Sequence, residues 1–543
     1  MTKISSMTLE QAFNNAVALM NSGQYEQAKD ICLQIRKVRP KVPDVHHLLG
    51  GIAFKLGDRE GAADHFSQVV RLNPDHIEAR TNLVKMLRDL NRWKEAEAHL
   101  TILARGNADD AAILKDLAKA QVQIKKYDEA LSTLQRALSS HDAPHIIQCE
   151  IADVHAKKGE LDKAAEVYLS VLKERPHFVP ALQNLSVIRD IQNRMDDALR
   201  LQQTAAEAEP ENADARTHFA LSLLARENFD RGWSEYNWRL HRTQTSTLHG
   251  RFDAPYWNGE PLEDQCILVW TEQGPGDEIL ISSMLPDVLV RCKKCIVVCT
   301  ERLAPIFERS FENVEVFTRE AVLKGNGPTE APDFQASLSH LGAQLRTAPD
   351  SFPHHHGYLR ADDGLIAELR EMYRADQNQP LIGISWHSAN LAPDAAERKS
   401  TLLQDWKDIL LTPNVKFVSL QYGDHDREIT NAKKHFDVKI VRDKSVDPLV
   451  SMDRFAAQVA AMDLVISVSN TTVHVAGALD KPVWTMVPAS LGRIWYWFLE
   501  RDTSLWYPSM RLYRQDHGTS WDRTIGAIAH ELKLWKDKAV KAQ

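Results

Sequence analysis

The hexapeptide GQYEQA, residues 23–28, decides the fold of the first part of the chain, because variants of it return every 34 residues. The six later copies are GDREGA at Gly57, NRWKEA at Asn91, KKYDEA at Lys125, GELDKA at Gly159, NRMDDA at Asn193 and ENFDRG at Glu227. A residue that is small in most copies precedes each one at the same period: Ala16, Gly50, Val84, Ala118, Ala152, Ser186 and Ala220. Such a regular period predicts stacked helical units rather than one compact core.

The period resembles that of the tetratricopeptide repeat (TPR), and its residues suit paired helices. Small side chains let the two helices of a pair approach closely, and a Gly or Asn at the first motif position ends the first helix. Proline stops the second helix in four units, at Pro40, Pro74, Pro176 and Pro210. We expect a TPR α-solenoid of seven 34-residue units over residues 1–245. Such an array holds a peptide or protein, or it merely spaces or oligomerises the rest of the chain.

A second architecture begins after FDRGWSEYNWRL (229–240), where aromatic residues replace the small ones and the period ends. Beyond it, short β-branched runs alternate with helical segments, which is typical of parallel sheets covered by helices. The runs are ILVW from Ile267, IVVC from Ile296, VEVF from Val314, LIGISW from Leu381, KFVSLQ from Lys416, VKIV from Val438, DLVISVS from Asp463 and PVWTMV from Pro482. We expect two Rossmann-like halves with a cleft between them, over residues 250–378 and 379–543.

Charge and composition argue against several classes of protein. The 66 Lys and Arg and 74 Asp and Glu residues give a net charge of -8 without a basic block, so we expect no nucleic-acid partner. No apolar run approaches the ~18 residues that cross a bilayer, which predicts no membrane span. The six cysteines are too sparse for a disulfide scaffold and favour a cytoplasmic protein. Cys292, Cys295 and Cys299 lack a second cysteine pair, so we expect no metal site.

The stretch TEQGPGDEIL (271–280) directly follows a predicted strand. Gly274 and Gly276 are expected to form a tight strand-to-helix turn, with Asp277 and Glu278 at the start of the helix and at the carboxyl end of the sheet. A carboxylate in that place caps the helix or acts as a general base. The residue types leave both interpretations of Asp277 open.

The stretch SVSNTTVHVAGALDKPVW (467–484) repeats this strand-to-helix arrangement with polar residues at the turn. Asn470, Thr471 and Thr472 offer side-chain and main-chain donors where a helix N-terminus favours an anion, and His474 follows closely. A phosphate or diphosphate fits this pattern. An ordinary Asn/Thr helix cap is the alternative.

Two further stretches belong to the second half. His387 in GISWHS (383–388) ends a predicted strand, and the loop after it carries Arg398 and Lys399, whose charge suits a phosphate leaving group. Merely solvated cations are the alternative. Gln421 in SLQYGD (419–424) ends the next strand and is expected to line a base or sugar pocket.

Taken together, these motifs resemble the glycosyltransferase domain of bacterial TPR-containing proteins, a group related to the heptosyltransferases and more distantly to TPR-bearing protein O-GlcNAc transferases. The matching segments are TEQGPGDEILISSMLPDVL, WHSAN followed by RKS, FVSLQYGD, DLVISVSNTTVHVAGALDKPVW and LWYPSMRLYRQ. The resemblance implies a GT-B fold with an acceptor-side first half and a donor-side second half. It implies that Asp277 is the catalytic base, that Lys399 contacts phosphate and that Asn470 to His474 form the phosphate loop. Pro275 and Ser469 depart from the heptosyltransferase pattern, in which an aliphatic residue and an Asp are usual.

The function expected from the sequence is sugar transfer from a nucleotide-sugar to Ser or Thr of a protein held by the TPR array. The nucleotide-sugar is a substrate, and no cofactor or metal is expected. Some proteins that this layout resembles modify flagellin with nonulosonic acids supplied as CMP-sugars. A lipopolysaccharide heptosyltransferase and a non-catalytic TPR scaffold are the alternatives. The expected acceptor-side loop residues are Gly274, Gly276 and Glu278, and the expected donor-binding residues are His387, Lys399, Gln421, Asn470, Thr471, Thr472 and His474.

Overall fold

The computed structural model divides into two compact units, Met1–Ile188 and Arg189–Gln543. It describes residues 8–139, 142–242, 248–374, 379–388, 398–490, 492–516 and 520–541, of which 538–541 by backbone alone. Part of each junction at which the sequence predicts a domain boundary, residues 243–247 and 375–378, lies outside the described residues. The predicted division into 1–245, 250–378 and 379–543 therefore stays a prediction.

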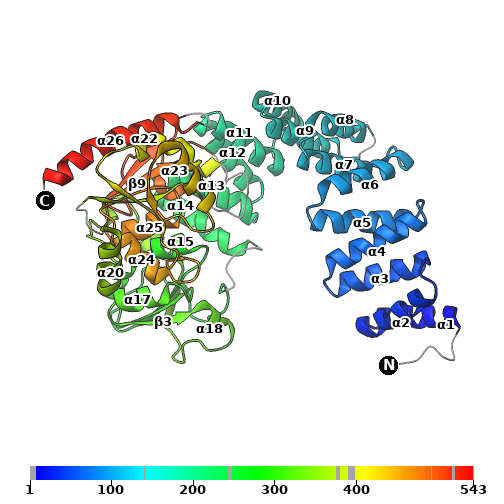
Figure 1. Ribbon diagram of the computed structural model, residues 1–543, viewed down its shortest axis with the longest axis horizontal. Helices are drawn as coiled ribbons and strands as arrows, with labels where there is room; N and C mark the ends of the chain where they lie inside the picture. Colours follow the sequence, from blue (N-terminus) through cyan, green and yellow to red (C-terminus); the bar gives the residue numbers. More distant parts are fainter. Residues whose placement is uncertain are drawn as a thin grey trace. The chain divides into compact units, whose positions relative to one another are not determined.

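The first unit consists of helices that pack in consecutive pairs, which confirms the predicted TPR solenoid fold (Figure 1). Its helices are α1 (Leu9–Asn21), α2 (Tyr25–Val38), α3 (Pro43–Lys55), α4 (Arg59–Leu72), α5 (Ile77–Asp89), α6 (Trp93–Gly106), α7 (Ala111–Gln123), α8 (Tyr127–Leu138), α9 (Pro144–Lys158) and α10 (Leu161–Glu174). Helix α11 (Val179–Ile191) crosses the division between the units.

A left-handed backbone residue ends the first helix of every pair, and it is always the first residue of the 34-residue motif. These residues have φ angles between 58° and 88°: Gly23, Gly57, Asn91, Lys125, Gly159, Asn193 and Glu227. The conformation turns the chain so that the next main-chain N–H reaches back to the helix, as from Gln24 to the carbonyl of Leu19 at 2.9 Å. Gly and Asn adopt it most easily, which explains their recurrence.

The small residues of the motif lie where two helices touch. A Cβ atom on Gly50 would come within 2.7 Å of the Phe66 ring, so α3 and α4 could not keep their spacing with a larger residue there. Ala16 and Ala152 are fully buried at the equivalent positions of other pairs. Close helix approach is thus the physical reason for the small-residue period.

Replacing Lys125 by Gly should stabilise the first unit by roughly 0.5 to 1 kcal/mol. A residue with a Cβ atom pays a steric cost in the left-handed conformation, and glycine does not. Glycine also raises the entropy of the unfolded chain, which lowers stability, but this effect is the smaller of the two. Denaturant unfolding followed by far-UV circular dichroism measures the change. Lys119→Gly is the matched control, because Lys119 is exposed inside α7, where glycine costs about 1 kcal/mol. Equal destabilisation by both variants would contradict the backbone explanation.

The second unit begins with repeat helices, of which the later ones share buried clusters with the α/β region. These are α12 (Met195–Ala208), α13 (Ala213–Ala225), α14 (Phe229–Tyr236) and the 3-10 helix η1 (Asn237–His241). Trp233 in α14 is fully buried, donates from Nε1 to the carbonyl of Arg346 at 2.9 Å, and meets the Trp495 ring edge to face at 5.3 Å between ring centres. A Cβ atom on Gly342 would come within 2.6 Å of Trp233. The aromatic junction seen in the sequence is therefore a packing core.

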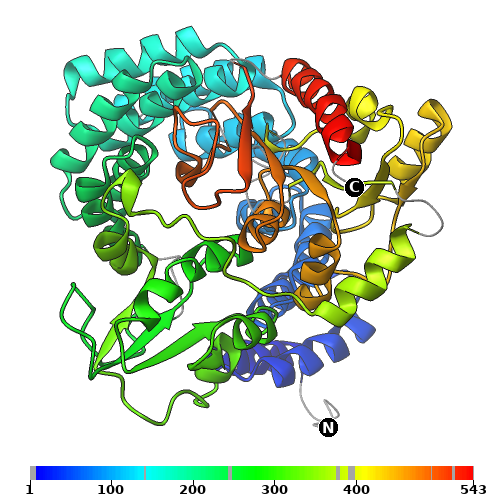
Figure 2. The same ribbon diagram turned by 90° about the vertical axis from the view of Figure 1, so that its left-hand side faces the viewer.

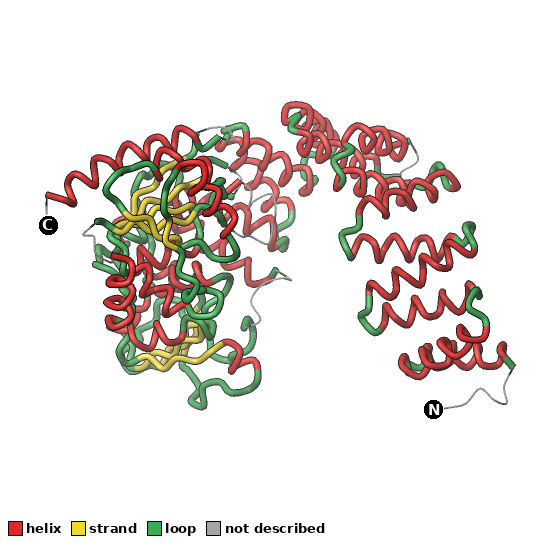
Figure 3. Tube along the Cα trace, viewed as in Figure 1, coloured by secondary structure: helices red, strands yellow, loops and turns green. Residues whose placement is uncertain are grey.

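Two parallel sheets form the α/β region, as predicted, and appear as two separate groups of strands in Figure 3. The four-stranded sheet has the order β3-β2-β1-β4, and the six-stranded sheet has the order β10-β9-β8-β5-β6-β7. The first contains β1 (Cys266–Trp270), β2 (Lys294–Cys299), β3 (Val314–Thr318) and β4 (Phe334–Ala336). The second contains β5 (Leu381–Ser385), β6 (Lys416–Ser419), β7 (Ile440–Val441), β8 (Leu464–Val468), β9 (Val483–Val487) and β10 (Met510–Arg514). The strands β1, β5, β8 and β9 are buried along their whole length, because helices cover the sheets.

Helices connect the strands of each sheet. The helices of the first sheet are α15 (Pro275–Ser282), α16 (Leu285–Leu289), α17 (Ala304–Ser310), α18 (Arg319–Leu323), α19 (Leu338–Leu345) and η2 (Pro349–Ser351). Helix α20 (Asp363–Arg374) precedes β5 and contacts the second half, where Arg370 pairs with Asp463 at 2.5 Å. The helices of the second sheet are η3 (Leu403–Trp406), α22 (Lys407–Leu410), α23 (Asp426–Phe436), α24 (Met452–Ala460), α25 (Thr471–Ala478), η4 (Trp495–Trp497) and α26 (Asp522–Lys541). The last helix, α26, packs on α22 (Figure 2), where Ile528 and Ile409 belong to one buried cluster. Every described helix is too short or too polar to span a membrane.

Strand order reverses once in each sheet, next to β1 in the first and between β5 and β8 in the second. In open parallel sheets, ligands bind outside the carboxyl ends of the strands at such a switch point. The chain leaves β1 into TEQGPGD, β5 into WHS and β8 into SNTT. Both switch points therefore carry the polar motifs that the sequence analysis selected.

Candidate functional site

Asp277 is the third residue of α15, whose N-cap is Gly274. Its Oδ2 atom accepts a hydrogen bond from the main-chain N of Gly274 at 3.3 Å, so the side chain contributes to the helix cap. Burial raises the pKa of Asp277 to about 6, while that hydrogen bond and the positive charge of Lys399 oppose the rise. A carboxylate with such a pKa is ionised at neutral pH and more basic than an ordinary Asp. Asp277 therefore both caps the helix and has the raised pKa that suits a general base.

Of the two glycines expected to form the strand-to-helix turn, Gly274 lies in it as the N-cap of α15 and Gly276 does not. The left-handed residue of the turn is Gln273, with φ of 67°, whereas Gly274 is extended and Gly276 lies inside α15. A Cβ atom on Gly276 would come within 2.9 Å of Cδ2 of His474 in α25. Gly276 is needed for close contact between the first turns of α15 and α25, the two helices that follow the switch-point strands β1 and β8.

His474 lies in a cage of aromatic side chains. Its Nδ1 atom is 2.8 Å from the hydroxyl of Tyr507 and its Nε2 atom is 3.2 Å from that of Tyr496. The ring stacks on Trp497 at 5.3 Å between ring centres. Burial lowers the pKa of His474 to about 3, and the Lys399 charge adds to this, so the imidazole is neutral. Both ring nitrogens already have partners, which suits a residue that holds α15 against α25.

Asn470 and Gln421 brace the loops at the second switch point. Oδ1 of Asn470 accepts from the main-chain N of Thr472 at 3.0 Å, and Nδ2 donates to Ser385 Oγ at 2.8 Å. Oε1 of Gln421 accepts from the main-chain N atoms of Trp386 and His387 at 2.9 and 2.8 Å. These amides hold the ends of β5, β6 and β8 together. The His387 ring is half-buried and 6.0 Å from that of His425, and its burial lowers its pKa.

The first turn of α25 leaves hydroxyl groups for a ligand. Within the described residues, Oγ1 of Thr472 is buried without a hydrogen-bond partner. Thr471 is the first residue of the helix and is partly exposed. The positive end of the helix dipole adds to their preference for an anion.

Lys399 is 6% exposed, yet it has no hydrogen bond or ion pair with another described residue. Burial lowers the pKa of Lys399, and the Asp277 carboxylate opposes that effect. The ammonium group is close enough to shift the pKa of both Asp277 and His474. A buried cation without a close partner is suited to an anionic ligand, because desolvation makes its charge costly until it is paired.

Glu278 has a different setting from its neighbour Asp277. It is fully buried, pairs with Nη2 of Arg319 at 2.8 Å, and accepts from the main-chain N of Thr300 at 3.0 Å. Burial raises the pKa of Glu278, and the Thr300 hydrogen bond and Arg319 oppose the rise. These contacts tie α15 to the end of β2 and to α18, so the side chain is committed to the fold.

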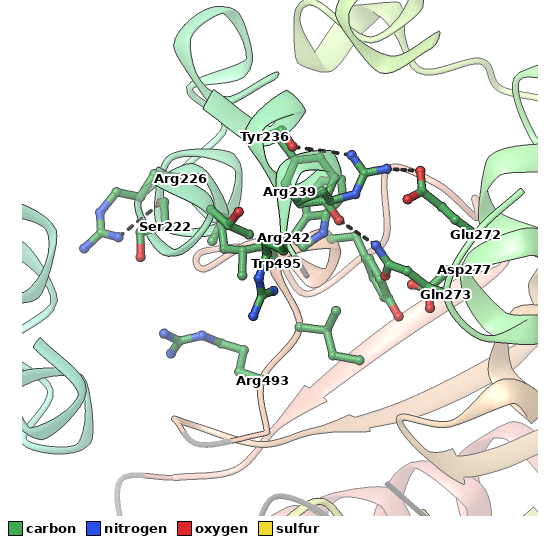
Figure 4. A pocket seen from close by; sticks show the side chains of 15 residues that line it. Ser222, Arg226, Tyr236, Arg239, Arg242, Glu272, Gln273, Asp277, Arg493 and Trp495 are labelled. Atoms are coloured by element: carbon green, nitrogen blue, oxygen red, sulfur yellow. Dashed lines mark hydrogen bonds and ion pairs between the residues drawn. The ribbon is translucent and has the colours of Figure 1, made fainter. Parts of the chain in front are cut away.

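A cavity of about 450 Å³ lies beside Asp277 (Figure 4). Helix α13, the end of α14, the β1–α15 loop and the loop before η4 form its walls. Its lining residues are Thr217, Leu221, Ser222, Ala225, Arg226, Tyr236, Arg239, Arg242, Glu272, Gln273, Asp277, Arg493, Ile494, Trp495 and Tyr496. Arg239 and Glu272 form a buried ion pair in it, and Nη1 of Arg239 also donates to Ser339 Oγ at 2.9 Å. The described residues contain no group of three or more His, Cys, Asp or Glu side chains placed to hold a metal ion.

The sequence analysis missed the arginines of this cavity. Arg226, Arg239 and Arg242 flank or belong to the aromatic junction, and Arg493 follows β9. Their concentration around FDRGWSEYNWRL was a signal, but the repeat helices were expected to serve the array alone. Only the packing of α13 and α14 against the α/β region brings these residues to Asp277.

Comparisons with known proteins agree with the two-part architecture. A family model described as "Tetratricopeptide repeat" matches residues 43–176. The chain contains TPR repeats followed by an α/β region. It is 26% identical to Protein FlbA of Caulobacter vibrioides (strain ATCC 19089 / CIP 103742 / CB 15) over 537 residues, which cover 95% of this chain and 89% of FlbA.

Solved structures match the TPR protein over a minority of its length. MamA from Desulfovibrio magneticus RS-1 is 19% identical, with a TM-score of 0.27, covering 31% of this chain and 97% of that one. A tetratricopeptide repeat protein from Parabacteroides merdae ATCC 43184 is 14% identical, with a TM-score of 0.34, covering 42% and 91%. TM-scores of this size establish no shared fold for the chain as a whole.

Arg239→Gln should destabilise the second unit by about 3 to 5 kcal/mol, because it leaves the Glu272 carboxylate buried without its cation. The double variant Arg239→Gln, Glu272→Gln should recover much of this loss, since no unpaired charge remains. Tryptophan fluorescence during urea unfolding reports on this unit, because Trp93 is the only one of the 13 tryptophans before residue 189. If the double variant were less stable than Arg239→Gln, the ion pair would not explain the loss.

Proposed function

We propose that the protein is a glycosyltransferase that moves a sugar from a nucleotide-sugar to a Ser or Thr hydroxyl of a protein recruited by its TPR array. The observation that carries this proposal is the contact between α15 and α25 at Gly276 and His474. It brings a basic carboxylate, Asp277, and an anion-binding helix end to the same place. Parallel sheets whose switch points converge in this way are compatible with a GT-B enzyme.

In this proposal Asp277 is the general base. Its carboxylate accepts the proton of the acceptor hydroxyl while that oxygen forms a bond to the anomeric carbon of the sugar. The bond from the anomeric carbon to the phosphate oxygen breaks, and the nucleotide leaves with the electron pair. A pKa of about 6 keeps the carboxylate ionised at neutral pH and brings its basicity nearer to the working pH.

Lys399 and the first turn of α25 bind the departing phosphate. The ammonium group supplies positive charge, and Thr471 and Thr472 supply hydroxyl donors. These groups are in place before the reaction, so they stabilise the developing charge without reorganisation. Asn470, Gln421, His387 and His474 position the loops around the donor. Gly274 lies in the acceptor-side turn as the N-cap of α15, and Gly276 lets α15 approach α25 beside it. Glu278 supports that turn through Arg319 and Thr300.

The acceptor protein is proposed to bind the TPR array. Among protein acceptors and nucleotide-sugar donors, the family resemblance favours flagellin as the acceptor and a CMP-activated nonulosonic acid as the donor. The sparse cysteines keep the cytoplasm as the predicted compartment. Mass spectrometry of nucleotide that co-purifies with the protein would identify the donor.

Asp277→Asn should lower turnover by roughly 100-fold to 10,000-fold, because the amide cannot accept the proton. Its melting temperature should not fall, since Asn also caps a helix and avoids the cost of a buried carboxylate. That cost is present above the folded pKa of about 6 and is relieved as pH falls and the carboxyl binds a proton. Sugar transfer to the acceptor and calorimetric melting measure the two effects.

The pH profile separates a base from a structural cap. In the native protein, turnover should fall about tenfold per pH unit below pH 6, where Asp277 is protonated, and Asp277→Asn should lack this limb. Asp230→Asn is the matched control, because Asp230 is an exposed carboxylate in the first turn of α14. Near-normal turnover by Asp277→Asn, with substrates bound normally, would contradict the assignment of Asp277 as the base.

Lys399→Met and Thr471→Ala should each weaken donor binding by roughly 1 to 3 kcal/mol and leave the fold intact, because each removes a contact to phosphate. Met keeps the aliphatic volume of the buried lysine. Isothermal titration calorimetry with the nucleotide-sugar measures the affinity. Lys433→Ala and Thr430→Ala, on exposed positions of α23, are the controls. Unchanged affinity in both test variants would remove the phosphate site from this loop.

A further inference from the structure

The cavity beside Asp277 extends away from the proposed phosphate site. Asp277 lines it, but Lys399, Thr471 and Thr472 do not. Helix α13 provides one wall through Thr217, Leu221, Ser222, Ala225 and Arg226. The proton that Asp277 accepts belongs to the acceptor. If the donor phosphate occupies the α25 side, this cavity is the space left for the acceptor.

Arginines give part of this cavity a positive charge. Arg242 donates from Nε to Asp214 at 2.5 Å, and its two Nη atoms have no hydrogen-bond partner among the described residues. Arg493 pairs with Asp190 at 2.7 Å. These bonds use only part of the hydrogen-bonding capacity of each guanidinium group, which carries five N–H donors.

Arg226 is the least neutralised of these cations. Its nearest carboxylate, on Asp196, is 3.8 Å away on a side chain that is 89% exposed. Nη2 of Arg226 donates to the main-chain carbonyl of Met195 at 2.6 Å and Nη1 to that of Ser222 at 3.3 Å, which fixes the side chain without cancelling its charge. Burial lowers the pKa of Arg226, and the like charge of Arg493 lowers it further. Two arginines that repel each other in a cavity favour an anion between or beside them.

The part of the cavity around Asp277 carries negative charge instead. Glu272 is neutralised by Arg239, which leaves Asp277 as the free carboxylate among the lining residues. Leu221, Ile494 and Trp495 add apolar surface to the lining. A ligand that fits this pattern has a hydroxyl at Asp277, a short apolar stem and an anionic group at the arginines (Figure 4).

We infer that the cavity binds the acceptor segment and selects a Ser or Thr that has an acidic residue next to it in the acceptor chain. The carboxylate of that residue pairs with Arg226, Arg242 and Arg493, and this orients the hydroxyl toward Asp277. A volume of about 450 Å³ holds a few side chains, which matches a short segment rather than a folded surface. The inference rests on the proposed function for the role of Asp277, and on the cavity itself for the charge preference.

The test is a binding measurement on the full chain with two synthetic probes, N-acetyl-Glu-Ser-Glu-amide and the neutral N-acetyl-Gln-Ser-Gln-amide. Ligand-observed NMR titration should give the acidic peptide at least a tenfold lower Kd. Arg242→Gln and Arg226→Gln should each reduce this preference at least threefold. Arg242→Gln is expected to fold, because its side chain is 38% exposed and makes one surface ion pair. Arg231→Gln is the matched control, since Arg231 is an exposed arginine of α14 outside the cavity lining.

The possible outcomes are distinct. Equal affinity for the two peptides, or a preference that survives both cavity variants, would overturn the inference. If the cavity variants instead weaken the nucleotide-sugar in calorimetry and leave the peptides unchanged, the anionic group belongs to the donor sugar and the acceptor assignment is wrong. Peptide binding does not require turnover. Failure of the proposed base is seen only in the Asp277→Asn kinetics, and failure of the cavity only in these titrations.

Discussion

The contact between the first turns of α15 and α25 is the constraint on which the candidate site depends. Gly276 has no room for a side chain because the His474 ring lies against it, and Tyr496, Tyr507 and Trp497 hold that ring in place. The two helices follow the switch-point strands β1 and β8 of different sheets. Their contact therefore gathers the polar ends of both sheets into one place.

The electrostatics of the site follow from this packing. Burial raises the pKa of Asp277 and lowers that of Lys399, which has no hydrogen bond or ion pair with another described residue. Each group opposes the shift in the other's pKa. Neither would behave in this way on an exposed loop, where water would screen both charges. The fold thus keeps a carboxylate of raised pKa near a buried ammonium group, at a cost in stability that is typical of functional sites.

Much of the fold could be predicted from the sequence because its determinants are local. The left-handed residue at the start of each 34-residue motif, the small residues at the helix contacts and the buried β-branched strands all act on near neighbours in the chain. Asp277 and Asn470 could be selected because each lies at the start of a helix that follows a strand, and Lys399 because its charge suits a phosphate. Local reasoning was less successful with Gly274 and Gly276, since the turn falls on Gln273 and the need for Gly276 comes from a residue almost 200 positions away.

The sequence by itself determined the repeat period, eight of the ten described strands and the identity of the polar turn motifs, because each depends on spacing or residue type. The strands β4 and β10 were not among the predicted runs. The tertiary structure alone decided which motifs meet, since strand order in the sheets is set by packing of distant segments. It also decided that α13 and α14 join the α/β core through Trp233 and bring Arg226 and Arg242 to the cavity of Asp277. The burial of these charged side chains sets the charge preference of the cavity. It arises only when distant segments of the chain pack together.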